Sequence, residues 1–376
     1  MIYLDISAAV HSRAGLGRYA EKLAHALMTA NPDAYGLFYN QGKDGRFPPS
    51  LSSFNRPQRH VAWGYKPWRM AILLAQLGHI PFNRLVPDAT LFHSTEHLLM
   101  PLRGVPTVLT VHDLIFKLFP AYHKKLNYWY LNLAMPLFCR KADAIITISQ
   151  ASKQDIVKQY NIDPAKIDVV YEAPSSLFQP VSPARAAHIK QTYSLPNRYL
   201  VHLSTIEPRK NLSRLLDVLK ALRRLFPSLS LVLAGGKGWL TDSFFAKIES
   251  EGLSDAVRVL GWVPDEDLPA IIAAADLAVH PSLYEGFGLP VLEHMACGQV
   301  VASSNRSSLP EVGGEAAVYF DPTNIEEMTA VIHRLLTDRD EYRHRQQLGF
   351  EQVNKFSWER TARETTAVYE KLLTNQ

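Results

Sequence analysis

Residues 277–298 read LAVHPSLYEGFGLPVLEHMACG, which combines a short apolar run, a glycine loop and the start of a helix. The run LAVH predicts a buried strand. Gly286 and Gly288 allow the loop to bring its backbone close to a ligand, and Pro290 suits the first turn of a helix. A strand, a loop and a helix in this order predict one unit of a parallel α/β sheet.

The same alternation continues outward in both directions. Strands are expected at residues 2–6, 90–93, 106–111, 144–149, 199–204, 229–234, 257–260, 277–280 and 300–303, with helices near 125–138 and 150–160. Crossover helices between such strands require parallel pairing, with helices on both faces of the sheet. Four prolines interrupt the pattern within 174–197. We therefore predict an α/β fold of two doubly wound, Rossmann-like domains, 1–173 and 198–357, joined by a linker at 174–197 and facing an interdomain cleft.

The length and composition agree with two globular domains. The chain has 376 residues, and ~150 residues are typical of one domain. Its two cysteines cannot form a disulfide framework or a cysteine zinc site alone, and they fit a reducing compartment. No secretory signal is visible, and the most apolar stretch, 70–80, is shorter than the ~20 residues that cross a bilayer. We expect a cytoplasmic protein.

The charge is distributed unevenly. The net charge of +4 is too small to indicate a nucleic-acid partner. Residues 1–173 nevertheless carry 19 Lys and Arg against 12 Asp and Glu, whereas the rest of the chain is slightly acidic. The two halves therefore either face different partners or differ by chance.

Two turns are candidate anion sites, one because it contains two glycines and the other because it contains two cations. Gly15 and Gly17 follow the first strand, and at the start of a helix they let backbone N–H groups approach an anion. Arg209 and Lys210 follow the strand at 199–204 and can converge on one polyanion, the arginine as a fork and the lysine as a point charge. The alternatives are a pair of turn glycines and an ordinary charged turn.

Carboxylates and a histidine mark two further strand ends. Glu285 and Glu293 lie on either side of the glycine loop, where together they can accept hydrogen bonds from the hydroxyls of a sugar or a ribose. Taken singly, they could be a capping and a surface glutamate. His112, in Val111-His112-Asp113-Leu114, ends a strand of the first half and is either a ligand contact or a structural histidine.

The stretch from Glu285 to Glu293 resembles the E-x7-E motif of the retaining family 4 glycosyltransferases (glycosyltransferase group 1), which have the GT-B fold. The likeness covers nearly the whole chain, through the glycine pair, VHDL at His112, ADAIITIS ending at Ser149, EPRKN around Arg209, and GWVP at 261–264. The resemblance implies transfer of a hexose from a nucleotide sugar, of the GDP-mannose or UDP-glucose type, to a hydroxyl of a saccharide or glycolipid acceptor in polysaccharide or glycolipid biosynthesis.

The resemblance also implies the site residues. The catalytic residues it implies are His112, Arg209, Lys210 and Glu285, and the donor-binding residues are Gly15, Gly17, Thr205, Val263, Gly286, Phe287, Gly288, Leu289 and Glu293. Glu293 would bind the ribose, Glu285 the donor sugar, and the two cations the diphosphate. The last helix, 358–376, would pack back on the first domain. One departure is Tyr171-Glu172-Ala173-Pro174, where the family often has an Asn-Gly-Val-Asp turn.

The expected chemistry is electrostatic. Loss of the diphosphate from sugar C1 leaves negative charge that cations and helix N-terminal amides stabilise, so neither a metal ion nor a cofactor is expected. The sequence has no HExxH or CxxC cluster. A sugar-nucleotide epimerase, a phosphorylase on a similar scaffold, and a catalytically inactive nucleotide-sugar-binding protein remain as alternatives.

A segment of the first half mixes aromatic, basic and apolar residues. It comprises WGYKPWR at 63–69, the apolar stretch 70–80, His123-Lys124-Lys125 and Tyr128-Trp129-Tyr130. Such a mixture predicts peripheral association with an anionic membrane at its inner face, or binding of a lipid-linked acceptor. The alternative is a buried amphipathic helix with a basic outer face.

Overall fold

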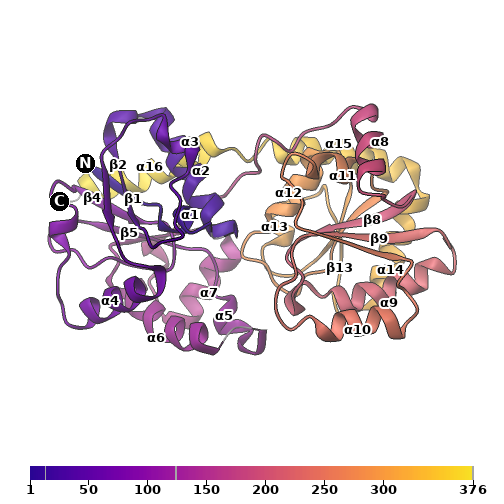
Figure 1. The fold of residues 1–376 in the computed structure, drawn as a ribbon, viewed down its shortest axis with the longest axis horizontal. Helices are drawn as coiled ribbons and strands as arrows, with labels where there is room; N and C mark the ends of the chain where they lie inside the picture. Colours follow the sequence, from indigo (N-terminus) through magenta and orange to yellow (C-terminus); the bar gives the residue numbers. More distant parts are fainter. Residues whose placement is uncertain (13, 123–124, 375–376) are drawn as a thin grey trace. The chain divides into compact units, whose positions relative to one another are not determined.

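The computed structural model describes residues 1–12, 14–122 and 125–374, which form two compact units (Figure 1). The first unit comprises Met1–Glu172 and Ser357–Gln376, and the second comprises Ala173–Phe356. The stretch 174–197, expected as a linker, belongs to the second unit and contains helix α8 (Pro183–Thr192), which packs on α11 (Leu268–Ala273).

The first unit is built on a parallel sheet. Within the described residues its strand order is β3-β2-β1-β4-β5-β6-β7. The strands are β1 (Ile2–Asp5), β2 (Tyr35–Asn40), β3 (Gln58–Val61), β4 (Leu91–Ser94), β5 (Thr107–Val111), β6 (Ala144–Thr147) and β7 (Ile167–Val169). Ile2 is in register with Tyr35 of β2 and with Leu91 of β4. The strand order reverses between β1 and β4, and this is the point where open α/β sheets bind ligands.

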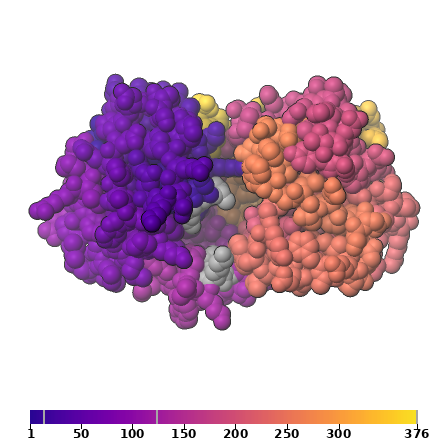
Figure 2. All heavy atoms as spheres, viewed as in Figure 1, coloured from indigo at the N-terminus to yellow at the C-terminus, as the bar shows by residue number. Residues whose placement is uncertain are grey.

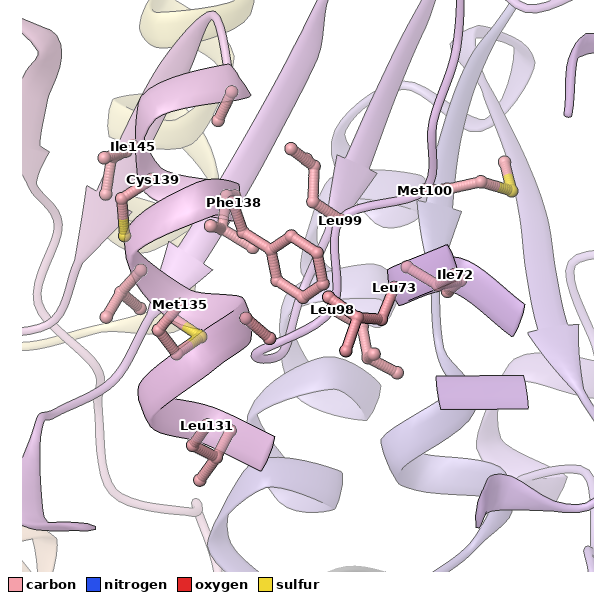
Figure 3. Packing of buried hydrophobic residues seen from close by; sticks show 14 of the residues in the cluster. Ile72, Leu73, Leu98, Leu99, Met100, Leu131, Met135, Phe138, Cys139 and Ile145 are labelled. Carbon is pink, nitrogen blue, oxygen red and sulfur yellow. The ribbon is translucent and has the colours of Figure 1, made fainter. Parts of the chain in front are cut away.

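Helices cover both faces of this sheet. They are α1 (Ser7–Val10), α2 (Ala14–Ala30), α3 (Pro49–Ser52), α4 (Tyr65–Leu77), α5 (Ile115–Leu118), α6 (Lys125–Lys141), α7 (Gln150–Tyr160), α16 (Trp358–Thr374) and the short 3₁₀ turns η1 (Pro32–Ala34), η2 (Asn83–Leu85), η3 (Pro120–Tyr122) and η4 (Pro164–Lys166). Figure 3 shows Phe138 of α6 pointing toward Leu98 and Leu99, with Ile72 and Leu73 of α4 on the other side of this core.

The C-terminal helix α16 packs on the first unit, against α2 (Figure 1). Its Tyr369 hydroxyl lies 2.6 Å from His93 Nδ1, and His93 Nε2 lies 2.7 Å from Thr110 Oγ1. In the space-filling view, yellow atoms of the C-terminal segment lie beside the indigo atoms of the first unit (Figure 2). Residues 375 and 376 of the predicted helix 358–376 lie outside the described residues.

The second unit repeats the design. Over the part of the chain described, its strand order is β10-β9-β8-β11-β12-β13, all parallel. The strands are β8 (Arg198–Leu203), β9 (Leu229–Ala234), β10 (Val257–Gly261), β11 (Leu277–His280), β12 (Val301–Ser304) and β13 (Val318–Phe320). Besides α8 and α11, the helices are η5 (Pro208–Lys210), α9 (Leu212–Arg223), α10 (Asp242–Ser250), α12 (Leu289–Ala296), α13 (Leu309–Gly313), α14 (Ile325–Thr337) and α15 (Arg339–Val353).

The predicted fold class of two doubly wound α/β domains is confirmed, and three of the four missed strands have recognisable causes. The expected strands at 229–234 and 277–280 and the helix at 150–160 have the observed bounds. Sequence analysis missed β2, β3, β7 and β13. Most of β3 (QRHV) is polar and exposed, while β7 and β13 are three residues long, so none of them shows a pattern that periodicity can detect.

Candidate active site

Four neighbouring strand ends of the second sheet bring the three predicted donor-site segments and one further glycine loop to one edge. The order β10-β9-β8-β11 aligns the residues that follow each strand: 262–263, 235–238, 204–210 and 281–288. The strand order reverses between β8 and β11, because β8 leads to β9 and β10 on one side and β11 returns on the other. The segments with Arg209 and Glu285 therefore flank the switch point.

Charged side chains meet at this switch point. Arg209 Nη1 donates to Glu285 Oε2 at 2.8 Å, and Lys210 Nζ donates to Glu285 Oε1 at 2.7 Å. The second guanidinium nitrogen, Arg209 Nη2, donates to Glu207. We call Glu207, Arg209, Lys210 and Glu285 the charged cluster. All four side chains are nearly buried, with at most 12% of any of them exposed.

Burial and ion pairing compete within the charged cluster. Burial would raise the pKa of Glu285, but the charges of Arg209 and Lys210 outweigh it and hold this pKa well below its usual range. Burial lowers the pKa of Lys210, and the Glu285 carboxylate opposes this shift. Glu285 is therefore an ionised hydrogen-bond acceptor at neutral pH, suited to the hydroxyls of a ligand.

Serine hydroxyls fix the position of Glu285. Ser282 Oγ donates to its carboxylate at 2.7 Å, and the Glu285 backbone N–H donates to Ser307 Oγ at 2.8 Å. Ser308 Oγ lies 3.0 Å from the Glu285 carbonyl oxygen and 2.7 Å from that of Phe287. These bonds orient the loop before any ligand binds, which lowers the cost of binding.

Asn211 ties the two loops together. It adopts the left-handed conformation, with φ of 59°, at the start of α9. Its Nδ2 donates to the carbonyl oxygens of Pro281 at 3.0 Å and Pro322 at 2.7 Å, and the Leu283 N–H donates to Arg209 O at 2.9 Å. The loop with the cations and the loop with Glu285 are thus held as one rigid piece.

The glycine loop leads into α12 as its sequence predicts. Gly288 has φ of 98°, and a side chain there would approach Leu309 to 2.7 Å, so only glycine fits without a shift. Gly286 and Phe287 are buried, and α12 begins at Leu289. Glu293 is 5% exposed within α12. Its carboxylate adds to the effect of burial in raising the pKa of Cys297 to about 12.

The glycine loop after β9 was not singled out from the sequence. A side chain at Gly235, which has φ of 144°, would lie 1.9 Å from the Ser204 carbonyl oxygen, and one at Gly238 would lie 2.5 Å from that of Ile206. This close approach places the loop directly beside Thr205, which is exposed. Gly-Gly-Lys-Gly at 235–238, directly after an apolar run, is the signal that could have indicated it. On the next strand, Val263 is 5% exposed after β10.

Three buried histidines lie next to the charged cluster. The ring of His280 on β11 is 5.0 Å from that of His202 on β8 and 5.0 Å from that of His294 on α12. His202 Nδ1 lies 2.7 Å from Val279 O, and because a carbonyl only accepts, this nitrogen carries the proton. Burial lowers the pKa of His202 to about 3 and that of His294 to about 4, and it takes the pKa of His280 well below its usual range. All three are neutral at pH 7.

In the first unit, His112 lies at the end of β5 and is 4% exposed. Its Nε2 donates to Thr95 O at 3.0 Å, and its Nδ1 lies 3.5 Å from Glu172 Oε1. The ring of Tyr19 packs edge-on against it, with the centroids 4.6 Å apart. Glu172 belongs to the segment that departs from the family's turn, so this departure supplies a carboxylate that faces the predicted catalytic histidine.

Gly15 and Gly17 lie in the first turn of α2. A side chain at Gly17 would lie 2.8 Å from Ala8 O of α1, so the packing of these two helices itself requires glycine there. A side chain at Gly15 would meet nothing within 4 Å. The anion-binding role of both residues stays a prediction.

Buried carboxylates at the switch point of the first sheet were also missed. Asp5 ends β1 and Glu96 follows β4, and both are at most 2% exposed. Burial, together with the Glu96 charge, raises the pKa of Asp5 to about 7. Tyr65 OH donates to Glu96 Oε2 at 3.0 Å. Asp5 and Glu96 are about ninety positions apart in the sequence, so no sequence motif contains both of them.

Two Asp-x-Asp triplets occur, at 265–267 and 338–340, and both have structural partners. Asp267 accepts hydrogen bonds from Arg185 and from Tyr193 OH, and Asp338 caps α15. Across residues 1–12, 14–122 and 125–374, no group of three or more His, Cys, Asp or Glu is arranged to hold a metal ion. Cys139 and Cys297 are both free thiols in the interior.

Comparison with known proteins covers both units. The model "Glycosyltransferase Family 4" matches residues 13–173, and "Glycosyl transferases group 1" matches residues 186–350. O-antigen chain mannosyltransferase B of Escherichia coli is 36% identical over 278 residues, which are 73% of this chain and 72% of that protein. MMP alpha-(1->4)-mannosyltransferase of Mycolicibacterium hassiacum is 33% identical over 285 residues, 72% of this chain and 66% of that protein.

Solved structures show the same architecture. HepE of Anabaena, in complex with UDP and glucose, superimposes with a TM-score of 0.74 at 19% identity, over 98% of this chain and 99% of that chain. Sucrose-phosphate synthase from Thermosynechococcus elongatus superimposes with a TM-score of 0.78 at 19% identity, over 100% of this chain and 99% of that chain. At this identity the likeness is one of fold. With the family models and the mannosyltransferase relatives, it shows that this chain belongs to the family 4 glycosyltransferases.

Proposed function

We propose that the protein transfers a hexose from a nucleoside-diphosphate sugar to a hydroxyl of a saccharide or lipid-linked acceptor, with retention at the anomeric carbon and without a metal ion. The observation that carries the proposal is the charged cluster at the switch point of the second sheet. Mannose is the favoured hexose, because two relatives at 36% and 33% identity are named as mannosyltransferases. Family membership favours transfer over the epimerase and phosphorylase alternatives.

The cations of the charged cluster suit a diphosphate leaving group. Lys210 Nζ has three donors and gives one of them to Glu285, so phosphate oxygens can take others. As the bond from C1 to the phosphate oxygen breaks, negative charge grows on that oxygen, and preorganised cations in a nearly dry site stabilise it. Glu285 then accepts hydrogen bonds from hydroxyls of the donor sugar, while Glu293 accepts hydrogen bonds from the ribose hydroxyls. Two cations at the diphosphate would do what a metal ion does in other enzymes, and this supports metal independence.

Retention follows most simply from attack on one face of the sugar. The acceptor oxygen forms its bond to C1 on the face from which the diphosphate departs. The acceptor proton passes to the departing phosphate oxygen, so charge and atoms balance without a protein nucleophile. The contacts of His112 and Gly17 with the donor are part of this proposal.

A donor screen tests the activity. Thermal shifts with UDP, GDP, ADP and their sugars identify the donor, since a ligand at 100 times its Kd stabilises by ~2.7 kcal/mol. The proposal predicts release of nucleoside diphosphate only when an acceptor is present, undiminished by EDTA, and an α-linked product from an α-linked donor by NMR. Tight nucleotide binding without turnover on any acceptor would instead support the inactive binding protein.

Peripheral membrane association is the second part of the proposal. Apolar side chains follow helical spacing on the outer faces of two helices, at Met70, Leu74 and Leu77 of α4 and at Leu126, Trp129 and Leu133 of α6, and 49–88% of each is exposed. We call these residues the apolar stripes. The two helices are neighbours, because Arg69 Nη1 donates to Asn127 Oδ1 at 2.8 Å and the Arg69 guanidinium lies 3.9 Å from the Tyr130 ring centroid.

Charge supports an anionic membrane as the partner of the apolar stripes. Residues 59–87 and 114–142 contain no Asp or Glu but several Lys and Arg. His123 and Lys124 of the predicted basic segment lie outside the described residues, while Lys125 is exposed. In the part of the chain that the structure describes, no helix is long and apolar enough to span a bilayer, so association would be at the surface.

Co-sedimentation with vesicles tests the association. The protein should sediment with anionic vesicles at low salt and much less with zwitterionic ones, and Leu74→Glu should reduce binding. Leu225→Glu, at a similarly exposed position of the second unit, is the matched control and should bind normally. Failure to bind anionic vesicles at low salt would end this part of the proposal.

A further inference from the structure

A cavity of about 770 Å³ lies in the first unit, apart from both sets of strand-end residues described above. Its apolar lining includes Trp63, Trp68, Phe82 and Leu85. Trp68 stacks on Phe82, with the centroids 5.7 Å apart, and Trp63 meets Trp68 edge-on at 6.3 Å. Cavities of ~300–1,000 Å³ with such walls bind apolar molecules of drug-like size.

Two arginines also line the cavity. Arg84 of η2 and Arg103 of the loop before β5 are exposed, and neither forms an ion pair with a residue of the described ranges. The segments that carry them are joined, because Asn83 Nδ2 donates to Arg103 O at 2.9 Å and the Arg103 N–H donates to Asn83 Oδ1 at 3.0 Å. The cavity therefore combines apolar walls with two cations, and no acidic residue lines it.

A buried donor in the wall lacks an acceptor. Trp68 is 3% exposed, and its Nε1–H has no hydrogen-bond partner among the described residues. An indole N–H in the interior normally finds a partner. An ester or phosphate oxygen of a bound molecule would supply one.

The surroundings point to the direction from which a ligand enters. Trp68 belongs to α4, the helix that presents Met70, Leu74 and Leu77 outward, and Trp63 is half exposed just before this helix. Figure 1 places α4 at the outer lower edge of the first unit, and Figure 2 shows purple atoms at the surface there. Trp side chains with one apolar and one wet end are typical of membrane–water interfaces.

We propose that this cavity binds one acyl chain of an anionic membrane phospholipid, whose phosphate pairs with Arg84 and Arg103. The apolar walls take the chain, and the two arginines select a negative head group over a zwitterionic one. The site would hold the enzyme at the membrane by a specific lipid in addition to the general attraction of the apolar stripes. It rests on the proposed membrane association for its biological setting, while lipid binding itself is measured in solution.

Calorimetric titration with two short-chain lipids tests the site. Dihexanoyl phosphatidylglycerol and dihexanoyl phosphatidylcholine, both used as monomers, have the same chains and differ in net charge. The wild-type protein should bind the glycerol lipid at least about tenfold more tightly, which corresponds to ~1.4 kcal/mol. Equal affinity for both lipids, or no binding of the anionic one, would overturn the proposal.

Variants separate the head-group and chain contributions. Arg84→Glu combined with Arg103→Glu should abolish the preference, whereas Arg224→Glu, an exposed charge reversal in the second unit, should retain it. Trp63→Ala should weaken the binding of both lipids. Since Trp63 is half exposed, this variant should fold. If it binds both lipids normally, the chain does not occupy the cavity. Inhibition by inorganic phosphate alone at equal concentration, or binding of farnesyl phosphate in place of the acyl lipid, would also contradict the proposal.

The same samples keep the two proposals distinguishable. A thermal shift with nucleoside diphosphates reports on the second unit and should be equal in the wild type and all of these variants. A wild-type protein that binds nucleoside diphosphate but not the anionic lipid refutes the lipid site alone, and a wild-type protein that binds the anionic lipid but no nucleoside diphosphate refutes the proposed donor site alone.

Discussion

The two units share an architecture but differ in what their strand ends carry. Each sheet is parallel, and each reverses its strand order beside the first strand, between β1 and β4 and between β8 and β11. In the second unit this point holds two cations paired with two carboxylates. In the first unit it holds buried carboxylates and, at the next strand end, His112 facing Glu172. The same backbone thus prepares one site for an anionic ligand and another suited to hydroxyl groups.

The outer surfaces differ as well. The first unit presents the apolar stripes on neighbouring helices in segments without acidic residues. In the second unit, Leu225, Leu240 and Trp262 are exposed from three separate loops. Singly exposed apolar residues are ordinary, whereas gathered ones indicate an interaction surface. We therefore propose membrane contact for the first unit and donor binding for the second.

Acidification should separate the units most strongly. Folding lowers the pKa values of His202, His280 and His294 below the ~6.5 of an ordinary histidine. Below pH ~6.5 the unfolded second unit therefore binds more protons than the folded one. Their stabilisation is complete above that pH and is lost as the pH falls toward about 4. The three together contribute a slope of up to about 4 kcal/mol per pH unit.

The first unit should respond less to acid. His93, with a pKa lowered by burial to about 3, has the same sign, but Asp5 has a raised pKa of about 7 and gains stability as the pH falls below it. Hydrogen exchange at pH 7 and 5.5, corrected for intrinsic rates, should show β8 and β11 losing more protection than β4 and β5. His294→Leu should reduce the slope, while His188→Ala, at an exposed position on α8, should not. Equal losses in both units would contradict this comparison.

Removing a cation from the charged cluster should have the next largest effect. Lys210→Ala should reduce turnover ~100–1000-fold, about 3–4 kcal/mol of barrier, because the departing diphosphate loses a preorganised charge. Glu293→Ala should also cost about 100-fold or more. Lys247→Ala removes an ion pair with Asp217 elsewhere in the second unit and is the control. Steady-state kinetics with near-normal rates in both site variants would refute the assignment.

His112 should matter for transfer more than for nucleotide binding. His112→Ala should lower kcat about 10–100-fold while Kd for the nucleoside diphosphate changes little, since the residue lies in the first unit. Glu172→Gln should give a smaller loss in the same direction, because the Glu172 carboxylate lies 3.5 Å from His112 Nδ1 and helps to orient the ring. If His112→Ala unfolds the protein, the residue is structural.

The smallest expected effect concerns the return of the chain to the first unit. Tyr369→Phe removes the hydroxyl that lies 2.6 Å from buried His93, and it should cost about 1–3 kcal/mol of unfolding free energy. Protection from exchange should fall in α16 and β4 and stay unchanged in the second unit. Denaturant unfolding with no change in midpoint would show that α16 is held by apolar packing alone.

The sequence predicted the parts that are local. Within about ten residues, local sequence patterns predicted the strand at 277–280, the loop with Gly288 and the turn with Arg209. The structure agrees with all three predictions. Family resemblance then placed these loops in one site.

The parts that were missed depend on contacts between distant segments. Glu172 reaches His112 through the sheet topology, and the effect of the Glu96 charge on Asp5 acts between the ends of two strands, so neither has a sequence spacing that could have predicted it. Glu207 joins the charged cluster because the turn between it and Arg209 orients its carboxylate toward the guanidinium group of Arg209. Exposed strand β3 shows no alternation because it lies at the sheet edge.

The most direct test of the account is calorimetric binding of a nucleoside, its monophosphate and its diphosphate to the wild type and to Lys210→Ala. We predict that affinity rises with each phosphate in the wild type, and that the variant loses the gain from the second phosphate while binding the nucleoside normally. Equal diphosphate affinity in the two proteins would show that the charged cluster does not hold the diphosphate and would contradict the central claim.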